Sequence, residues 1–316
     1  MKILFIGLGS IGKRHLMNTK SLLDERGIHH EIHCIKSSKK VYDEGIDKVF
    51  FSYEDIDDFY DCIFITNPTN LHYDTLRKVI NIGENIFLEK PVFDDYKYDI
   101  SFINKDNMDK IYVAAPLRYT QVYMKIKELL KSEKIHSVRS ICSTYLPEWR
   151  KDCDYRDIYS AHKNRGGGVS IDCIHEWDYI CDLVGYPEKI HNFQDKISNL
   201  EVNCEDISIY IARTNNIFIE LHLDYFGKKW RREVEVITES GMIKGDFINK
   251  TVYNSIDNTM QKYDYDNNYI YEEEIKYFFD IVCNGMGNEN NIYKGLKVLR
   301  LIKESEENED FNNNLW

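Results

Sequence analysis

The sequence predicts an α/β protein in two parts: an N-terminal doubly wound parallel sheet, then an α/β domain with a large, mostly antiparallel open sheet. Two observations predict this class. Through roughly the first 115 residues, short apolar runs alternate with helical patterns, which is typical of a parallel sheet with helices on both faces. After Gln121, apolar runs follow one another without helices between them, which indicates an antiparallel sheet. We therefore expect two domains, residues 1–120 and residues 121–316.

Each expected element of the first domain is short and bounded by turn-forming residues. The strand patterns lie at residues 2–6, 30–36, 47–51, 61–66, 85–88 and 111–115, and the helical patterns at 11–25, 56–60, 71–82 and 98–104. Thr69 or Asn70 is the expected cap of the 71–82 helix, because either side chain can accept a hydrogen bond from the first turn. Gly83 is expected to end that helix.

The second domain shows a different order of elements. Helical patterns occupy residues 122–130, 169–183, 271–283 and 292–304, and strand patterns occupy 137–145, 188–197, 207–213, 217–223, 233–238 and 241–246. Residues 146–163 are polar and aromatic without periodicity, and at this length they indicate a functional loop rather than a simple connection. The charged tail after Lys303 is expected to fray.

A glycine turn follows the first strand and opens the first helix. Gly7, Gly9 and Gly12 form the pattern G-x-G-x-x-G, with Ser10 and Ile11 inside it. In this context the pattern predicts the dinucleotide-binding turn of a Rossmann fold. The first glycine permits the tight turn, the second lets the backbone approach a pyrophosphate, and the third lets helix and strand pack closely. The N–H groups at the helix N-terminus would bind the phosphates. A glycine-rich turn in another kind of α/β protein is the alternative.

The end of the second strand bears on which dinucleotide is bound. An NAD-selective site usually has an acidic residue there, but the residues present are Lys36 and Ser37, followed by Ser-Lys-Lys. Glu31 lies at the opposite end of the strand. Cations and hydroxyls suit a 2′-phosphate, so NADP is preferred over NAD. The alternative is an ordinary solvated Lys/Ser turn.

Composition limits the class of protein and its partners. The formal net charge of −12 argues against nucleic acid, which requires a clustered basic surface. The apolar N-terminus is too short and too rich in glycine for a signal peptide or a membrane span, so we expect no membrane partner. The eight cysteines form neither C-x-x-C nor a zinc spacing. We therefore expect reduced thiols, no metal and a cytoplasmic location.

Candidate chemistry lies at the carboxyl ends of the parallel strands, where such sheets bind ligands. Three tripeptides fall there: Thr66-Asn67-Pro68, Glu89-Lys90-Pro91 and Leu117-Arg118-Tyr119. Lys90 could hydrogen-bond a carbonyl or hydroxyl group and stabilise a developing alkoxide. The following proline restricts Lys90 to an extended conformation. A surface lysine after a strand is the alternative.

A second candidate cluster follows Gly166-Gly167-Gly168 on the expected helix 169–183. Asp172 and His175 are three residues apart, as are His175 and Asp178, so either carboxylate can neighbour the imidazole. Such a pair suits an acid/base that exchanges a hydroxyl proton while hydride moves. Two alternatives remain: acidic residues favoured by the helix dipole beside an unrelated histidine, or a His/Asp/Glu metal site that nothing else supports.

Substrate-binding groups are expected in the 146–163 segment and beside it. Its aromatic rings suit sugars, and its guanidinium groups can recognise phosphate or carboxylate. The candidates are Trp149, Arg156 and Tyr159, with Arg118 and Tyr119. An ordinary polar loop is the alternative.

Together these motifs resemble the Gfo/Idh/MocA oxidoreductases over nearly the whole chain. The resemblance rests on the glycine turn, Ile65-Thr66-Asn67-Pro68-Thr69 with His72, Glu89-Lys90-Pro91, and the glycine run with Asp172 and His175. It implies a Rossmann domain joined to an α/β domain whose open sheet makes a homodimer or homotetramer. It also implies that NAD(P) is used to oxidise or reduce sugars, cyclitols or nucleotide sugars.

The resemblance also assigns individual residues. Lys90 matches the catalytic lysine, whose bond to Pro91 is often cis, and Asp172 and His175 match the second catalytic motif. The usual spacing between these two is four residues and here it is three, which leaves open whether Asp172 or Asp178 partners His175. The expected cofactor-binding residues are Gly7, Gly9, Ser10, Ile11, Gly12, Lys36, Ser37, Thr66, Asn67, Pro68, His72, Glu89 and Lys90.

A narrower resemblance concerns Leu146-Pro147-Glu148-Trp149-Arg150 and the later His222-Leu223-Asp224-Tyr225. It is similar to a subgroup found with genes for bacterial surface polysaccharides and sialic-acid-like sugars. The expected function is hydride transfer between the nicotinamide and a sugar or nucleotide sugar, with His175 exchanging the proton and Lys90 polarising the oxygen. The alternatives are a glycosidase that uses NAD without net oxidation and a non-catalytic dinucleotide-sensing regulator.

Overall fold

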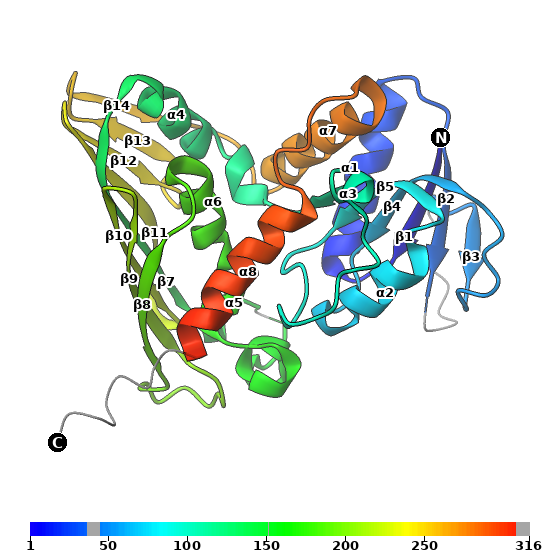
Figure 1. The fold of residues 1–316 in the computed structure, drawn as a ribbon, viewed down its shortest axis with the longest axis horizontal. Coiled ribbons are helices and arrows are strands. Elements are labelled where there is room, and N and C mark those ends of the chain that lie inside the picture. The colour runs from blue at the N-terminus through cyan, green and yellow to red at the C-terminus, as the bar shows by residue number, and fades with distance from the viewer. Residues whose placement is uncertain (37–44, 151, 308–316) are drawn as a thin grey trace. The chain divides into compact units, whose positions relative to one another are not determined.

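The computed structural model describes residues 1–36, 45–150 and 152–307, and its contacts divide the chain into two compact units (Figure 1). The first unit contains Met1–Pro116 and Asn267–Leu296, and the second contains Leu117–Asp266 and the chain from Lys297 onward. The boundary between the two units, after Pro116, lies close to the expected domain boundary at residue 120. The return of residues 267–296 to the first unit has no counterpart in the sequence patterns.

The first unit is built on a parallel sheet of six strands within the described residues. The strands are β1 (Lys2–Ile6), β2 (Glu31–Ile35), β3 (Lys48–Phe50), β4 (Tyr60–Ile65), β5 (Gly83–Leu88) and β6 (Ile111–Val113). Their order is β3-β2-β1-β4-β5-β6, and every neighbouring pair is parallel. The strand order reverses at β1 and β4, so the carboxyl ends of these strands flank the crevice where such folds bind ligands. This confirms the predicted doubly wound Rossmann sheet.

Helices from both ends of the chain pack in this unit. They are α1 (Ser10–Glu25), α2 (His72–Val79), α3 (Lys105–Met108) and α7 (Tyr269–Asn284), with a 3₁₀ turn η1 (Thr69–Leu71) before α2. Phe64 stacks between Phe5 and Phe87 at centroid distances of 4.5 and 5.0 Å, and Phe278 of α7 meets Phe64 edge-on at 5.4 Å. α7 therefore completes the apolar core of the sheet.

Two expected helices of the first unit are wrong. Residues 56–59 are irregular, and Tyr60 begins β4 with its ring fully buried, because burying that ring in the sheet outweighs a weak local helical pattern. Residues 98–104 form turns, in which the Asp99 carboxylate accepts hydrogen bonds from the backbone and side chain of Ser101. Such side-chain bonds compete with helix formation.

The expected bounds of the helix that includes α2 are also wrong. The chain enters α2 through the 3₁₀ turn η1, and neither η1 nor α2 has a side-chain cap among the described residues. Gly83 begins β5 rather than ending the helix, and it pairs with Tyr60. A Cβ atom on Gly83 would lie 2.6 Å from the Ile63 side chain, so close packing against β4 explains this glycine.

The second unit contains a sheet of eight strands within the described part of the chain. The strands are β7 (Ile135–Tyr145), β8 (Lys189–Asp195), β9 (Ile207–Thr214), β10 (Ile217–Asp224), β11 (Phe226–Thr238), β12 (Met242–Asp246), β13 (Thr251–Asn254) and β14 (Thr259–Lys262). Their order is β14-β13-β12-β11-β7-β10-β9-β8, antiparallel except for β7 with β10. The predicted large, mostly antiparallel sheet is confirmed. β13 and β14 were not expected.

Helices cover one face of this sheet. They are α4 (Gln121–Leu129), α5 (Val169–Asp172) and α6 (Ile174–Val184); α8 (Ile292–Glu307) comes last in the chain. The Tyr179 hydroxyl of α6 lies 2.6 Å from Ser140 of β7, and α4 packs on β12. On the other face, alternate residues such as Phe193, Ile211 and Phe218 are exposed.

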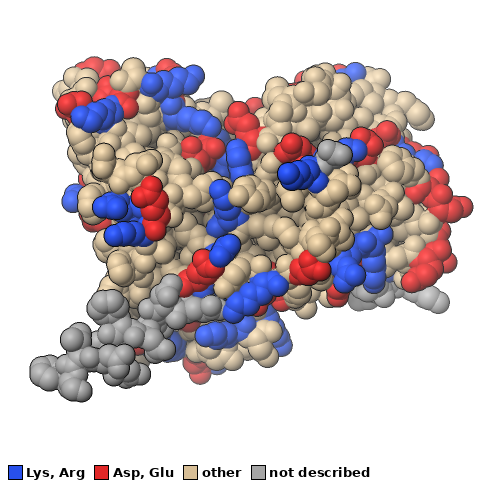
Figure 2. Space-filling model, viewed as in Figure 1, with Lys and Arg blue, Asp and Glu red and all other residues tan. Residues whose placement is uncertain are grey.

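Residues 146–165 run through four 3₁₀ turns: η4 (Leu146–Glu148), η5 (Tyr155–Asp157), η6 (Tyr159–Ala161) and η7 (Lys163–Arg165). The expected helix 169–183 is interrupted at Cys173, whose ψ of 27° separates α5 from α6. On the face seen in Figure 2, basic and acidic side chains are interspersed. Among the described residues, no helix is both long enough and apolar enough to cross a membrane.

Candidate functional site

The three glycines after β1 have different surroundings. Gly7 has a φ of +93°, and a Cβ atom there would lie 2.6 Å from the backbone of Asn67. A Cβ atom on Gly12 would lie 2.2 Å from the Gly7 carbonyl oxygen, so only glycine lets α1 pack this closely on the turn. A Cβ atom on Gly9 would meet no atom within 4 Å. The turn is therefore open at Gly9, where a pyrophosphate would approach.

The N-terminus of α1 is available to an anion. Gly9 is its N-cap, and among the described residues no side chain caps this end and no acidic residue lies in the first turn. The first N–H groups of a helix lack partners within the helix and carry a partial positive charge. Residues 10–12, which include Ser10 and Ile11, therefore provide a phosphate-binding end of the expected kind.

The loop after β4 is fastened to this turn. The Thr66 hydroxyl donates to the Gly7 carbonyl oxygen at 2.5 Å, and the Asn67 amide donates to Thr75 at 2.8 Å. The Asn67 side-chain oxygen is buried and has no hydrogen-bond partner in the described chain. Pro68 precedes η1 with an extended ψ of 141°. Thr66 and Asn67 thus border the open side of the glycine turn.

His72 is buried between the loop after β4 and the loop after β5. Its ring nitrogens lie 2.9 Å from the Asn67 carbonyl oxygen and 3.0 Å from that of Pro91, and the side chain is 1% exposed. Burial lowers the pKa of His72 despite these carbonyl contacts. His72 therefore joins the loop after β4 to the loop after β5.

The Glu89-Lys90-Pro91 segment is held from α1. Glu89 Oε1 lies 2.6 Å from Nε2 of His15, and Glu89 Oε2 accepts a hydrogen bond from the Lys90 backbone at 3.1 Å. Burial alone would raise the pKa of Glu89, but the hydrogen bond and charge of His15 outweigh it and lower that pKa. The Lys90–Pro91 bond is cis, as the resemblance implied. Sequence reasoning missed His15, although it lies three residues after the last glycine of the motif.

At the end of β2, Lys36 is 9% exposed and its N–H donates to the Phe50 carbonyl oxygen at 3.0 Å. Its charge lowers the pKa of Cys34, although burial dominates and raises it overall. Ser37 lies outside the described residues, so the structure adds nothing on that residue.

In the second unit, the glycine run fits closely against its neighbours. Gly166 and Gly168 have φ values of +80° and +136°, which favour glycine. A Cβ atom on Gly167 would lie 2.3 Å from the Tyr159 carbonyl oxygen, and one on Gly168 would lie 2.1 Å from the Glu205 carboxylate. The run therefore brings the η6 backbone against the start of α5.

Asp172, at the end of α5, accepts a hydrogen bond from the Tyr225 hydroxyl, which donates to Asp172 Oδ2 at 2.5 Å. The charge of Asp172, together with burial, raises the pKa of Tyr159 far above its ordinary value. Trp149 meets the Tyr225 ring edge-on at 5.4 Å. The fold thus brings together three residues that the sequence had suggested as site residues: Asp172, Tyr159 and Trp149. It adds Tyr225, which the sequence had not suggested.

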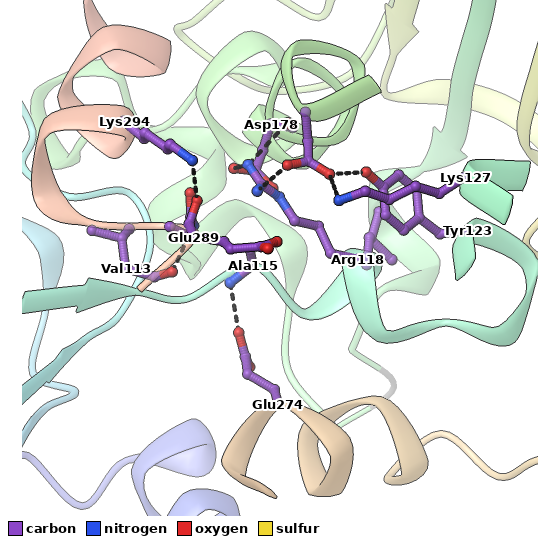
Figure 3. Close-up of polar contacts among 12 residues, drawn as sticks. Val113, Ala115, Arg118, Tyr123, Lys127, Asp178, Glu274, Glu289 and Lys294 are labelled. Atoms are coloured by element: carbon purple, nitrogen blue, oxygen red, sulfur yellow. Dashed lines mark hydrogen bonds and ion pairs between the residues drawn. The ribbon is translucent and has the colours of Figure 1, made fainter. Parts of the chain in front are cut away.

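His175 lies in the first turn of α6 and is partly exposed. Because the helix breaks at Cys173, Asp172 and His175 are not separated by one regular turn of a single helix. One turn further on, Asp178 is held by Arg118, which donates to both of its carboxylate oxygens at 2.8 Å (Figure 3).

Arg118 also donates to Asp182 at 2.8 Å, and its side chain is only 9% exposed. Burial alone would lower the pKa of Arg118, but the two carboxylates outweigh it and raise that pKa. Asp182 further binds Lys127 at 2.7 Å and the Tyr123 hydroxyl. Arg118 thus fastens α6 to the segment that leads into α4 (Figure 3).

Arg156 and Tyr119 are the two remaining substrate candidates. Arg156 is 53% exposed and pairs with Asp154 at 2.5 Å and with Glu201 at 2.8 Å. Tyr119 lies half-buried in the 3₁₀ turn η2 (Pro116–Tyr119).

One group of metal-ligand residue types was not anticipated: Cys142, Cys173 and Glu176 lie close together and are buried. The two sulfur atoms are 3.7 Å apart, and Arg232 donates to Glu176 at 2.7 Å. The guanidinium group therefore already neutralises this carboxylate, and the cluster is a buried ion pair beside two thiols.

Comparison with known proteins agrees with this architecture. Residues 1–99 match the Gfo/Idh/MocA family model, described as an oxidoreductase family with an NAD-binding Rossmann fold. Oxidoreductase P35 of Formosa agariphila is 27% identical over 221 residues, which cover 66% of this chain and 67% of that protein. The family model therefore confirms the expected resemblance over residues 1–99.

Solved structures share the fold over nearly the whole chain. An oxidoreductase from Thermotoga maritima has a TM-score of 0.79 with 20% identity, over 96% of this chain and 95% of its own. Scyllo-inositol dehydrogenase from Lactobacillus casei with bound NAD(H) and scyllo-inositol has a TM-score of 0.73 with 18% identity, over 97% and 96%. The WlbA dehydrogenase of Bordetella pertussis, in complex with NADH and UDP-GlcNAcA, has a TM-score of 0.72 with 15% identity, over 97% and 96%.

Proposed function

We propose that this protein is an NAD(P)-dependent oxidoreductase acting on a carbinol or carbonyl carbon of a sugar or nucleotide sugar. The observation that carries the proposal is the arrangement at one edge of the parallel sheet. There, an open glycine turn and an uncapped helix follow β1, and the Glu89-Lys90-Pro91 segment follows β5. A dinucleotide bound at such an edge supplies a hydride donor or acceptor through its nicotinamide ring.

The residues at this edge of the parallel sheet fit a bound dinucleotide. The backbone around Gly9 and the first N–H groups of α1 would bind the pyrophosphate. Thr66, Asn67 and Pro68 would line the adjoining wall, where the buried Asn67 oxygen still has an unused acceptor position. Lys36, with Ser37, would favour the 2′-phosphate of NADP. That preference rests on residue type at the end of β2.

Lys90 and His175 are the proposed catalytic residues. Lys90, whose backbone is fixed by Glu89, would hydrogen-bond the reacting oxygen and stabilise its developing charge. His175 would take up or return the hydroxyl proton. Arg118 would position α6 rather than contact substrate, because its guanidinium is already bound to Asp178 and Asp182.

Two observations support a sugar or nucleotide sugar as the substrate: the side chains near Asp172 in the second unit, and the ligands of solved structures with this fold. Trp149 and Tyr159 present aromatic surface and a hydroxyl beside Asp172, with Tyr119 and Arg156 as further candidates. Relatives of this fold were solved with scyllo-inositol and with UDP-GlcNAcA. We further propose that the protein acts in surface-polysaccharide or amino-sugar biosynthesis and that it does so in the cytoplasm. The exposed sheet face with Phe193, Ile211 and Phe218 would form the homodimer or homotetramer.

The test is a spectrophotometric screen of NADH and NADPH oxidation against keto nucleotide sugars, together with NAD⁺ and NADP⁺ reduction by inositols and nucleotide sugars. Turnover that Lys90→Ala abolishes is the expected result. Substrate conversion without any net change in nicotinamide absorbance would instead favour the glycosidase reading. Cofactor binding without conversion of any substrate would favour the regulator.

A further inference from the structure

We propose that Cys142, Cys173 and Glu176 form a zinc-binding site inside the second unit. The two Sγ atoms and a carboxylate oxygen of Glu176 all lie within 4.8 Å of one another. Each of the three residues is at most 1% exposed. The proposed hydride transfer uses none of them, so this inference goes beyond the proposed function and does not depend on it.

The backbone brings these donors to one place. Cys173 is the N-cap of α6, and the Glu176 N–H donates to the Cys173 carbonyl oxygen at 3.1 Å, so the two residues lie one helical turn apart on the same side of the helix. Cys142 pairs with Arg232 across β7 and β11, so their side chains lie on the same face of the sheet. The Arg232 guanidinium donates to Glu176 at 2.7 Å, which shows that this face meets the first turn of α6. One helical turn and one cross-strand pair therefore supply the whole cluster.

The distance between the two sulfur atoms fits a shared zinc ion. Cys142 Sγ and Cys173 Sγ are 3.7 Å apart, and both thiols are free. Two thiolates on a tetrahedral zinc ion, with Zn–S bonds of about 2.3 Å, lie about 3.8 Å apart. A disulfide would need a separation of about 2.05 Å. A thiol–thiol hydrogen bond without a metal is the competing arrangement, and the carboxylate of the cluster favours the metal.

Glu176 has one oxygen available as a ligand. Its Oε1 accepts the hydrogen bond from Arg232, whereas its Oε2 is buried and has no hydrogen-bond partner in the described part of the chain. A buried carboxylate oxygen without a partner is costly, and a metal ion would supply that partner. Arg232 would then orient the carboxylate, as hydrogen bonds to ligating groups do in metal sites.

The charges of the cluster also suit a divalent ion. Without a metal, the charges of Glu176 and Arg232 cancel, and the two thiols are neutral. Zinc binding removes one proton from each thiol, so two thiolates offset the two charges of Zn²⁺. The cluster is neutral in both states, which avoids an uncompensated buried charge. Two thiolates and one carboxylate suit Zn²⁺ rather than Ca²⁺ or Mg²⁺, which take oxygen ligands. A water molecule would occupy the fourth tetrahedral position.

Arg232 provides a route to the site. Its side chain is 24% exposed, whereas that of Glu176 is completely buried. Movement of this one side chain would open the cluster to solvent, so the ion could be loaded into the folded chain. The bound ion would join β7 to the first turn of α6, which also carries His175.

The first test measures metal binding with Co²⁺, which absorbs visible and near-ultraviolet light strongly when thiolates bind it. The untagged full chain is reduced, stripped with a chelator and titrated with Co²⁺. We expect thiolate-to-cobalt absorption that saturates at one ion per chain and disappears when Zn²⁺ is added. Cys142→Ser should lose this absorption. The matched control, Cys181→Ser, removes a buried thiol of α6 outside the cluster and should keep it. No such absorption in the wild type, or its persistence in Cys142→Ser, would overturn the proposal.

The second test does not require a cysteine variant to fold. Near neutral pH in weak buffer, Zn²⁺ binding to the wild-type chain should release about two protons per ion, because both thiols ionise. Glu176→Gln keeps the shape of the side chain and both thiols, and it should weaken Co²⁺ binding tenfold or more. Zinc binding without proton release, or equal Co²⁺ affinity in Glu176→Gln and the wild type, would exclude this set of ligands.

Discussion

The carboxylate of Glu89 and the imidazole of His15 lie 2.6 Å apart, and the histidine is completely buried. The pair joins α1, whose N-terminus faces the proposed pyrophosphate position, to the segment that carries Lys90. The position of the proposed catalytic lysine is thereby tied to the helix that binds the cofactor.

Replacing His15 by alanine should destabilise the first unit by about 3 kcal/mol, because it leaves the Glu89 carboxylate buried without its partner. Glu89→Gln is the control, since it removes the charge and keeps the shape. Equilibrium denaturation in urea measures both variants. Equal stability of wild type and His15→Ala would show that the pair contributes nothing.

The same pair predicts a pH dependence. The folded-state pKa of Glu89 is lowered below its ordinary value of 4.5, so its stabilising effect is present above that pH. It is lost as the pH falls through the folded-state pKa. The difference in stability between wild type and Glu89→Gln should therefore shrink below about pH 4.5. A difference that stays constant from neutral to acid pH would contradict this.

Gly9 and Gly12 should respond oppositely to alanine. At Gly9 an added methyl group meets no protein atom, so Gly9→Ala should keep the wild-type melting temperature but weaken NADH binding by tenfold or more. At Gly12 the methyl group would lie 2.2 Å from the Gly7 carbonyl oxygen, so Gly12→Ala should lower stability itself. Thermal unfolding and NADH fluorescence titration separate the two effects. Unimpaired NADH binding by Gly9→Ala would argue against a cofactor at this turn.

Lys90→Ala should leave cofactor affinity within a few-fold and reduce kcat by about 10²–10³, because it removes a donor aimed at developing negative charge. Lys97→Ala is the matched control, since Lys97 is an exposed lysine a few residues further along the same segment. Steady-state kinetics with the substrate found in the screen gives the comparison. Equal losses in both variants would mean that position 90 has no special role.

Arg118→Leu should destabilise the second unit by about 3 kcal/mol, because the bidentate partner of the largely buried Asp178 is removed. Asp182 keeps its contacts with Lys127 and Tyr123 in this variant. Arg118→Lys preserves the positive charge but not the planar guanidinium group that binds both carboxylate oxygens. It should therefore recover only part of the stability lost in Arg118→Leu. If Arg118 contacts substrate instead, Arg118→Lys would raise KM without lowering the free energy of unfolding.

The parts of the fold that the sequence predicted are those fixed by local pattern. β1 agrees with its expected bounds because five consecutive apolar or half-buried residues precede a glycine that needs a positive φ. The cofactor turn was predictable because its residues are adjacent in the chain. The expected helix at 56–60 failed because a long-range pairing, Tyr60 with Gly83, determines that segment.

The missing parts of the candidate site are contacts between distant residues. His15 meets Glu89 across 74 positions, and Asp172 meets Tyr225 across 53. No periodicity encodes such pairs, and a helical i,i+3 argument for Asp172 and His175 could not foresee the break at Cys173. β13 and β14 are four residues each; β14 is wholly exposed and β13 buries a single apolar side chain, Val252, so neither gives a periodic apolar run.

The return of Asn267–Leu296 to the first unit constrains how the chain is made. Phe278 of α7 packs on Phe64 and Phe87, so the core of the Rossmann sheet stays incomplete until that helix has left the ribosome. Domains generally fold in the order of their synthesis. Here the second unit has been almost entirely translated before the first receives its last helix. The nascent nucleotide-binding half therefore leaves the ring surfaces of Phe64 and Phe87 that contact Phe278 uncovered until α7 has been synthesised.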